Sequence, residues 1–171
     1  METKRNNQTC WFAAHTRCGA ELRIREWLGR LGTEHFLPTE RRSHTRGHAT
    51  YEKPLIPGLI FVRATKTQAC ALANEQGLPV RYLIDPATKT LLVVPDKQME
   101  DFQRVLNLST EEGGLLDRPL ALGDRVRVIK GVLNGVEGRV LEFHGRTYVV
   151  VELLGSWFAR ADVPRAWLEL I

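Results

Sequence analysis

The residues best suited to chemistry lie near the start of the chain, where Cys10, His15 and Cys18 stand close together. Thiolate and imidazole groups at short spacing are common ligands of zinc. A cysteine beside a histidine can also act as a nucleophile with its base. His44 and His48 are the other residues that could complete a metal site.

The spacing of these residues argues against both kinds of site. Cys10 and His15 are five residues apart, so on one strand their side chains point to opposite faces. The sequence offers no fourth ligand at sensible spacing, and no carboxylate or amide is placed to orient His15 as a base. No glycine-rich loop with a lysine follows a strand, as a phosphate-binding loop requires. We therefore predict that the protein is not an enzyme and binds no metal or cofactor; metal analysis of purified protein tests the hydrolase or metalloprotein alternative.

The most distinctive part of the sequence is the glycine-punctuated segment 123–140. Gly131, Gly135 and Gly138 interrupt it, and Asn134 before Gly135 makes a strong turn dipeptide. Apolar residues alternate with charged ones on both sides of the turn, as in half-buried strands. These apolar residues are Val126, Val128, Val136 and Val140. The pattern predicts a tight all-β module in which the turn glycines have a structural role.

Upstream of this module, apolar periodicity predicts strands alternating with helices. Ile24, Trp27, Leu28 and Leu31 form the stripe of an amphipathic helix, and Gly32 follows as its C-terminal cap. We expect strands at residues 10–16, 34–38, 59–62, 80–84 and 91–94, and helices at residues 24–31, 66–76 and 96–106. Residues 39–53 are polar and basic, which predicts a mobile loop or the tip of a hairpin. The order fits an α+β fold in which helices cover an antiparallel sheet.

The composition divides the chain into four parts. Residues 1–9 are polar and expected to be disordered, and residues 10–106 form the α+β domain. Residues 107–118 are small and acidic like a flexible linker. About five short strands follow in residues 119–171, which fit a small closed β-barrel better than a sheet with exposed edges.

Charge and apolar content indicate a cytoplasmic protein. Residues 1–106 contain 16 Lys and Arg against 11 Asp and Glu, whereas residues 107–171 contain 8 against 9, so the net charge of +4 comes from the first part. Nucleic acid, if bound, should therefore meet that part. No apolar run approaches the roughly 18 residues of a membrane span, and the polar N-terminus lacks the apolar segment of a signal peptide. Three cysteines make no disulfide framework, which favours reduced thiols.

The segment 123–140 resembles a KOW motif, which occurs in the NusG transcription factors and in several ribosomal proteins. Three further features resemble the NusG N-terminal domain in their order and spacing: Trp11-Phe12, the Pro57-Gly58 turn before an aliphatic–aromatic strand, and Val94-Pro95-Asp96 before the last helix. Over residues 10–171 the combination is most similar to specialised paralogues of the UpxY and RfaH type. One departure is Leu154-Gly155-Ser156-Trp157, where the general factor usually has Phe-Gly-Arg followed by Thr-Pro.

The resemblance implies a monomeric bacterial transcription elongation or antitermination factor. It would promote processive transcription of particular operons, with surface-polysaccharide operons as candidates. The front domain would bind the clamp helices of RNA polymerase through an apolar patch of His15, Leu59, Phe61 and Tyr82. Basic residues would contact non-template DNA or nascent RNA in the elongation complex; they are Arg17, Arg23, Arg30, Arg41, Arg42, Arg46 and Lys53. The SH3-like KOW barrel would recruit a ribosomal protein or a termination factor.

A ribosome-associated RNA-binding protein is the main alternative, because KOW modules also occur in such proteins. This alternative predicts that the barrel itself binds nucleic acid, which its near-neutral charge disfavours. A pull-down from bacterial lysate distinguishes the two hypotheses. Polymerase subunits would support the transcription factor, and ribosomal subunits alone would support the alternative.

Overall fold

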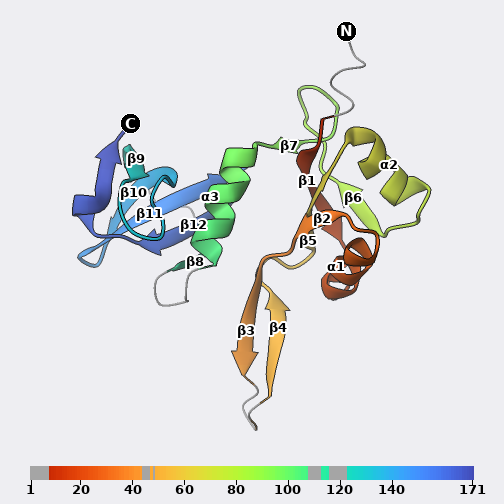
Figure 1. Ribbon diagram of the computed structural model, residues 1–171, viewed down its shortest axis with the longest axis horizontal. Helices are drawn as coiled ribbons and strands as arrows, with labels where there is room; N and C mark the ends of the chain where they lie inside the picture. Colours follow the sequence, from red (N-terminus) through yellow and green to blue (C-terminus); the bar gives the residue numbers. More distant parts are fainter. Residues whose placement is uncertain (1–7, 44–46, 48, 108–112, 116–122) are drawn as a thin grey trace. The chain divides into compact units, whose positions relative to one another are not determined.

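The computed structural model describes residues 8–43, 47, 49–107, 113–115 and 123–171. The chain forms two compact units, Met1–Pro95 and Asp96–Ile171, each with its own antiparallel sheet (Figure 1). The combination of helices and antiparallel sheets agrees with the predicted α+β class. The boundary differs from the expected one, because the helix at residues 96–106 groups with the second unit. The disorder predicted for residues 1–9 falls almost wholly outside the described residues.

The first unit is built on a sheet with the strand order β2-β5-β1-β6, in which β7 also pairs with β1. Its strands are β1 (Cys10–Thr16), β2 (Glu34–Phe36), β5 (Leu59–Ala64), β6 (Val80–Tyr82) and β7 (Val93–Val94). The predicted strands of this unit are therefore confirmed, although β2, β6 and β7 are shorter than expected. Beyond them the chain continues only as an isolated bridge between Ile84 and Leu91.

Two helices, α1 (Glu21–Arg30) and α2 (Lys66–Asn74), cover one face of this sheet (Figure 1). The predicted stripe of α1 is confirmed at Ile24 and Leu28, which are completely buried, whereas Trp27 is half-buried. Leu31 follows the last residue of the helix and is 43 % exposed. Gly32 follows the helix with a φ of +65°, which explains why a glycine ends it. Helix α2 begins with a capping box between Thr65 and Gln68. The strand side chains that share this core are Phe12, Ala14, Ile60, Val62, Ala64 and Tyr82.

The basic segment after β2 forms a hairpin of its own. Strands β3 (Thr39–Ser43) and β4 (Thr50–Pro54) pair only with each other, in antiparallel register, among the strands that the structure describes. Figure 1 shows them projecting away from the main sheet of the unit. At their base the N–H of Leu55 donates to the carbonyl of Pro38 at 2.8 Å. Of the two predicted forms, the hairpin is therefore correct for the described residues.

The second unit contains a six-stranded antiparallel sheet with the order β13-β9-β10-β11-β12-β8. Its strands are β8 (Gly113–Leu115), β9 (Arg125–Val128), β10 (Glu137–Phe143), β11 (Arg146–Leu153), β12 (Trp157–Asp162) and β13 (Leu168–Leu170), the last preceded by the 3-10 helix η1 (Arg165–Trp167). Strand β8 lies inside the segment predicted as a linker and pairs with β12. Closure of this sheet into an SH3-like barrel stays a prediction.

Helix α3 (Asp96–Leu106) belongs to the second unit because it contacts β8, β11 and β12. Its polar side chains also bind the glycine-rich turn between β9 and β10. The ammonium group of Lys97 donates to the carbonyl of Gly135 at 2.8 Å, and Arg104 donates to two carbonyls of the same turn at 2.8 and 2.9 Å. The sequence pattern alone could not reveal these contacts, because they depend on which sheet the helix meets.

Candidate functional site

The central strands of the first unit are apolar on both sides. In β5, Leu59, Ile60, Phe61 and Val62 are all nearly inaccessible. Ile60 and Val62 belong to the core beneath α1 and α2, so their neighbours Leu59 and Phe61 point to the other side. We call this other side of the sheet the apolar face. Its apolar side chains, placed by the strand register, are Trp11, Ala13, Phe36, Leu59, Phe61 and Val94.

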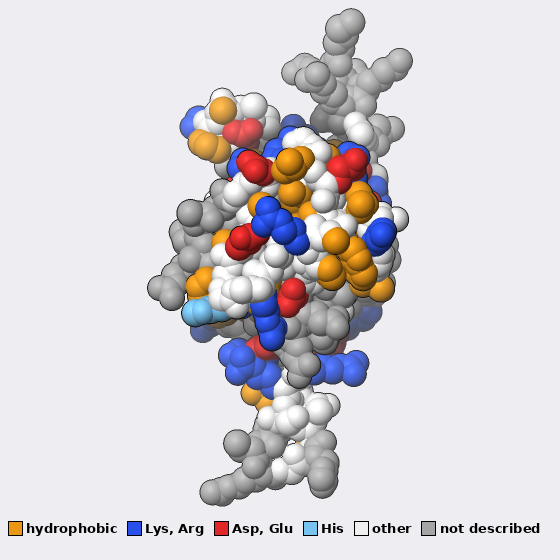
Figure 2. All heavy atoms as spheres, turned by 90° about the vertical axis from the view of Figure 1, so that its left-hand side faces the viewer, with side chains coloured by type: hydrophobic (Ala, Val, Ile, Leu, Met, Phe, Trp, Pro, Cys, Tyr) orange, Lys and Arg blue, Asp and Glu red, His pale blue; other side chains and the backbone are white. Residues whose placement is uncertain are grey.

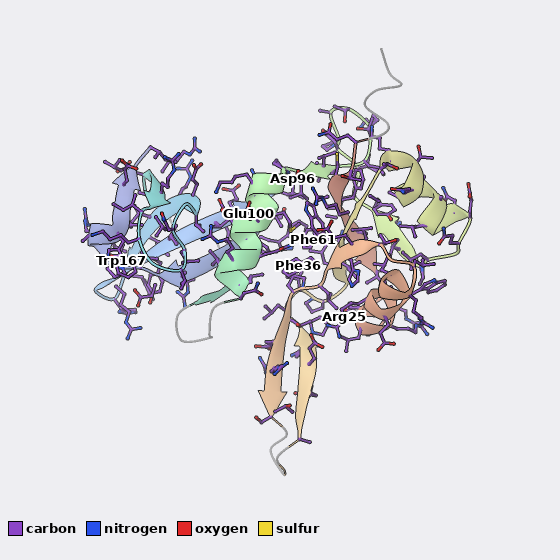
Figure 3. All side chains as sticks on the ribbon, in the orientation of Figure 1. Arg25, Phe36, Phe61, Asp96, Glu100 and Trp167 are labelled. Atoms are coloured by element: carbon purple, nitrogen blue, oxygen red, sulfur yellow. The ribbon has the colours of Figure 1, made fainter. Side chains whose placement is uncertain are left out.

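Aromatic stacking lies at the centre of the apolar face, and charged groups lie toward its ends. Phe36 is opposite Phe61, and the two rings stack with centroids 6.1 Å apart and planes inclined by 25° (Figure 3). His15, which is exposed, lies opposite Arg81 near one end. An apolar centre with a polar rim is the usual anatomy of a protein-binding surface.

The structure brings His15, Leu59 and Phe61 together on the apolar face but not Tyr82. Tyr82 is opposite Ala14 and therefore points into the core beneath the helices. It is 8 % exposed and meets Phe12 edge-to-face at 6.2 Å. Burial raises the pKa of its hydroxyl to about 12. The expected placement of Tyr82 in the patch is therefore wrong. The pairing register of β6 decides which face Tyr82 occupies, and a strand of three residues shows too little alternation to reveal that register.

Trp11 and Phe36 also lie on the apolar face, although neither residue was predicted from the sequence to belong to the patch. Trp11 shares the face of His15 because they lie four residues apart on β1. That even spacing was the available sequence signal. Phe36 had no such signal, since its place depends on the pairing of β2 with β5.

The three arginines predicted near the first helix are all exposed. Arg17 lies in the turn before α1, and Arg23 and Arg30 lie on α1. Arg23 and Arg30 are seven residues apart, so they share one side of the helix at a separation of roughly 10 Å along its axis. Such a row of cations suits a phosphate backbone, although three exposed arginines are also common on ordinary surfaces.

The basic residues of the hairpin divide between its two faces. Arg41 lies opposite Glu52, whereas Arg42 lies opposite Tyr51 and Lys53 opposite Glu40. Because opposite residues share a face and successive residues alternate, Arg42 and Lys53 are on one face and Arg41 is on the other. Figure 2 shows Lys and Arg side chains gathered where the hairpin leaves its unit. The remaining predicted member, Arg46, lies outside the described residues.

A bidentate ion pair joins the hairpin to α1. The two terminal nitrogens of Arg25 donate to the two carboxylate oxygens of Glu52 at 2.6 and 2.7 Å (Figure 3 labels Arg25). Thr39 donates to the same carboxylate at 2.6 Å. These hydrogen bonds, with that of Arg25 the stronger influence, lower the pKa of Glu52 to about 2. The fork geometry fixes direction as well as distance, so it sets how the hairpin leaves α1.

The three glycines predicted for the turn lie where a positive φ or close packing favours glycine, although Gly138 is in strand β10 rather than in the turn. Gly131 has a φ of +75°, and a Cβ there would come within 2.5 Å of the Trp167 ring. Gly135 has a φ of +87°. At Gly138 a Cβ would come within 2.3 Å of the carbonyl oxygen of Val150 on β11. The structural role predicted for these glycines follows from these contacts.

Those residues considered for catalysis or metal binding that the structure describes do not form a metal-binding group. The described residues contain no group of three or more His, Cys, Asp or Glu side chains able to hold a metal ion. Cys10, Cys18 and Cys70 are free thiols, and His44 and His48 lie outside the described residues. No helix among the described residues is long and apolar enough to cross a membrane.

Comparison with known proteins identifies a solved structure of similar fold and a matching protein family. A structure on domain interaction in Thermotoga maritima NusG aligns with a TM-score of 0.52 at 17% identity, covering 96% of this chain and 98% of that chain. The MjSpt4:Spt5 complex in conformation B aligns at 15% identity over 94% and 96% of the two chains, with a TM-score of 0.29. No curated protein matches the sequence. The profile of the family described as "NusG: Transcription termination factor nusG" matches residues 9–103, more than half of the chain. The chain therefore belongs to the NusG family of transcription factors.

Proposed function

We propose that this protein is a specialised bacterial transcription elongation and antitermination factor that binds RNA polymerase through the apolar face. The observation that carries the proposal is the two-sided apolar character of β1 and β5. Helices α1 and α2 account for one side only. Membership of the NusG family supports a role for the remaining face in transcription, since transcription elongation and its regulation are the activity of that family.

Binding would depend on a few aromatic anchors. Phe61, Phe36 and Trp11 are large apolar side chains on one side of the strands, which suits the clamp helices of the polymerase, and His15 supplies a polar rim. Leu59 and Phe61 have almost no exposed surface in the structure. Holding the polymerase clamp closed would then bias it against paused states, which requires only about a few kcal/mol of differential affinity.

Nucleic acid would be a second, weaker partner within the same complex. Arg17, Arg23 and Arg30 would meet the non-template strand or the nascent RNA by phosphate contacts. Few such contacts bind weakly on their own, but docking on the polymerase raises their effective concentration at the strand. The second unit would recruit a further partner, a ribosomal protein or a termination factor, in the manner expected of a KOW module.

Binding of the full chain to purified bacterial RNA polymerase tests the proposal. Phe61→Ala and His15→Asp should weaken binding, Phe61→Ala by about 1–3 kcal/mol if it is a hot spot. Tyr82→Phe is the matched control, because Tyr82 lies in the core and its change leaves the apolar face intact. Thermal melting of each variant must match the parent before binding is compared. Unchanged polymerase binding by folded Phe61→Ala and His15→Asp would contradict the proposal, and capture of ribosomal subunits alone would favour a ribosomal RNA-binding protein.

A further inference from the structure

The β3–β4 hairpin continues from the two strands that carry the centre of the apolar face (Figure 1). Strand β2 ends at Phe36, and β3 begins at Thr39. Strand β4 ends at Pro54, and β5 begins at Leu59. Strands β2 and β5 pair with each other, and Phe36 lies opposite Phe61. A partner bound to the apolar face at these two rings would therefore lie next to the base of the hairpin.

The hydrogen-bond ladder is interrupted between the main sheet and the hairpin. Strands β3 and β4 form a separate two-stranded sheet, and residues 37–38 and 55–58 connect it to β2 and β5. At this junction the N–H of Leu55 donates to the carbonyl of Pro38 at 2.8 Å. A two-stranded hairpin is only marginally stable by itself, so its direction depends on side-chain contacts with the rest of its unit.

Helix α1 supplies such a contact on one face of the hairpin. Opposite residues on paired strands share a face, so Arg41 and Glu52 lie together, and Thr39 is on the same face two residues before Arg41. Glu52 accepts hydrogen bonds from both terminal nitrogens of Arg25 on α1 at 2.6 and 2.7 Å, and from Thr39 at 2.6 Å. These bonds, that of Arg25 first, lower the pKa of Glu52 to about 2, so the pair is charged at neutral pH. We call Arg25, Thr39 and Glu52 the hairpin mount.

The other face of the hairpin, which we call the outer face, points away from α1. It consists of Glu40, Arg42, Tyr51 and Lys53. The apolar face is also on the side of its sheet away from α1, because α1 packs on the core side. Arg42 donates to Glu40 at 2.6 Å, and Lys53 lies opposite Glu40, so a carboxylate partly balances these cations. Mixed charge of this kind suits the polar rim of a protein interface.

We propose that Arg25 is a positioning residue for polymerase binding. Through Glu52 and Thr39 it holds the outer face of the hairpin beside the apolar face, so that the chain presents one continuous surface to the polymerase. The apolar face would supply the centre of this interface, and the hairpin would supply part of its rim. Holding the hairpin in its bound direction beforehand reduces the entropy cost of fixing it in the complex. The inference rests on the proposed function for the identity of the partner.

Residual dipolar couplings of backbone amides measure the direction of the hairpin in the full chain. In the parent, the amides of β3 and β4 should share one alignment frame with those of β1 and β5. In Arg25→Met and in Glu52→Gln the couplings of the hairpin should become smaller, whereas those of the main sheet should stay unchanged. Glu26→Gln is the control, because it removes a charge at the next, exposed position of α1 and leaves the hydrogen bonds of the mount in place.

Binding of the same variants to purified bacterial RNA polymerase tests the function of the mount. Arg25→Met should weaken binding by about three- to fivefold, because the hairpin must then be ordered on binding. Glu52→Gln should weaken binding equally, and the double variant should weaken it no further, since both changes break one pair. Glu26→Gln should bind like the parent. Thermal melting confirms that each variant is folded at the temperature of the binding measurement.

Three results would overturn the inference. The first is hairpin couplings that do not change in Arg25→Met. The second is a hairpin that loses its fixed direction while polymerase binding is unchanged, which would make the mount purely structural. The third is a loss from Arg25→Met that Glu52→Gln does not reproduce, which would mean that Arg25 itself touches the polymerase. These three results leave the proposed function in place, whereas a parent chain that binds no polymerase would overturn the proposed function together with the inference.

Discussion

The carboxylate of Asp101 accepts the backbone N–H of Glu137 at 3.1 Å, although 36 residues separate them in the sequence. The same carboxylate receives the ammonium group of Lys97 at 2.6 and 2.7 Å, and Asp101 is only 2 % exposed. Burial of a carboxylate is tolerated only when its oxygen atoms accept hydrogen bonds, as both oxygens of Asp101 do here. Asp101 thus ties α3 to the start of β10, in addition to the packing of the helix against β8, β11 and β12.

Replacing Asp101 should destabilise the second unit. Asp101→Ala leaves the Glu137 N–H without its acceptor and Lys97 without its partner, which should lower the free energy of unfolding by about 1–3 kcal/mol. Urea unfolding followed by NMR amide signals of the second unit measures the change. Glu100→Gln is the control, because Glu100 is the exposed residue immediately before Asp101 on α3. It should change the free energy of unfolding by no more than about 0.5 kcal/mol. Equal stability of both variants would show that α3 is not held by Asp101.

The pair between Arg25 and Glu52 should make the hairpin mount sensitive to acid. The folded-state pKa of Glu52 is lowered from 4.5 to about 2, so its contribution to stability is fully present above pH 4.5. That contribution is lost as pH falls from about 4.5 through about 2, when the carboxylate is protonated. Because both side chains are about one-third exposed (32% and 35%), the expected contribution is at most about 1 kcal/mol.

Titration of the Glu52 carboxyl carbon by NMR measures this directly. Arg25→Met removes the largest cause of the low pKa and should move the Glu52 titration upward toward 4.5. Arg42→Gln removes a hairpin charge on the other face and should leave the titration in place. A Glu52 that titrates near 4.5 in the parent protein would contradict the bidentate geometry.

The glycines of the second unit should differ in their tolerance of a side chain. Gly138→Ala drives a Cβ against the backbone carbonyl of Val150, which cannot rotate away, and should lower the free energy of unfolding by about 2–3 kcal/mol. Gly145 has a φ of +74° with no atom within 4 Å of its Cβ position, so Gly145→Asn should be nearly neutral because asparagine tolerates that conformation. Thermal melting of both variants gives the order, and a reversed order would mean that β10 and β11 are not packed as described.

Removing the hydroxyl group of Tyr82 should not harm the protein. Among the described residues this buried oxygen has no hydrogen-bond partner, and burial of an unpaired hydroxyl is unfavourable. Tyr82→Phe should therefore keep or raise the free energy of unfolding, by up to about 1 kcal/mol, and keep polymerase binding unchanged. Chemical denaturation checks the first expectation. A clear loss of stability would mean that the hydroxyl group has a partner in solution.

The sequence by itself determined the local elements of this protein. The apolar run Leu59–Val62 predicted β5, and the stripe that includes Ile24 and Leu28 predicted α1. Gly32, with its positive φ, ended that helix as expected. These features could be predicted because they depend on residue periodicity and on glycine conformation, both of which act between near neighbours in the chain. The family resemblance rested on such local features, and the profile match over residues 9–103 confirms the NusG family. The KOW motif and the specialised type stay predictions.

The tertiary structure decided which surfaces these elements form. Tyr82 entered the core rather than the apolar face because the register of β6 against β1 set its side, and a three-residue strand carries too little alternation to show it. Helix α3 joined the second unit through Asp101 and Glu137, and Arg41 was separated from Arg42 by the pairing of β3 with β4. Each outcome depends on contacts between residues distant in sequence. An amphipathic pattern records that a face is buried or exposed, but it does not record the partner that buries it.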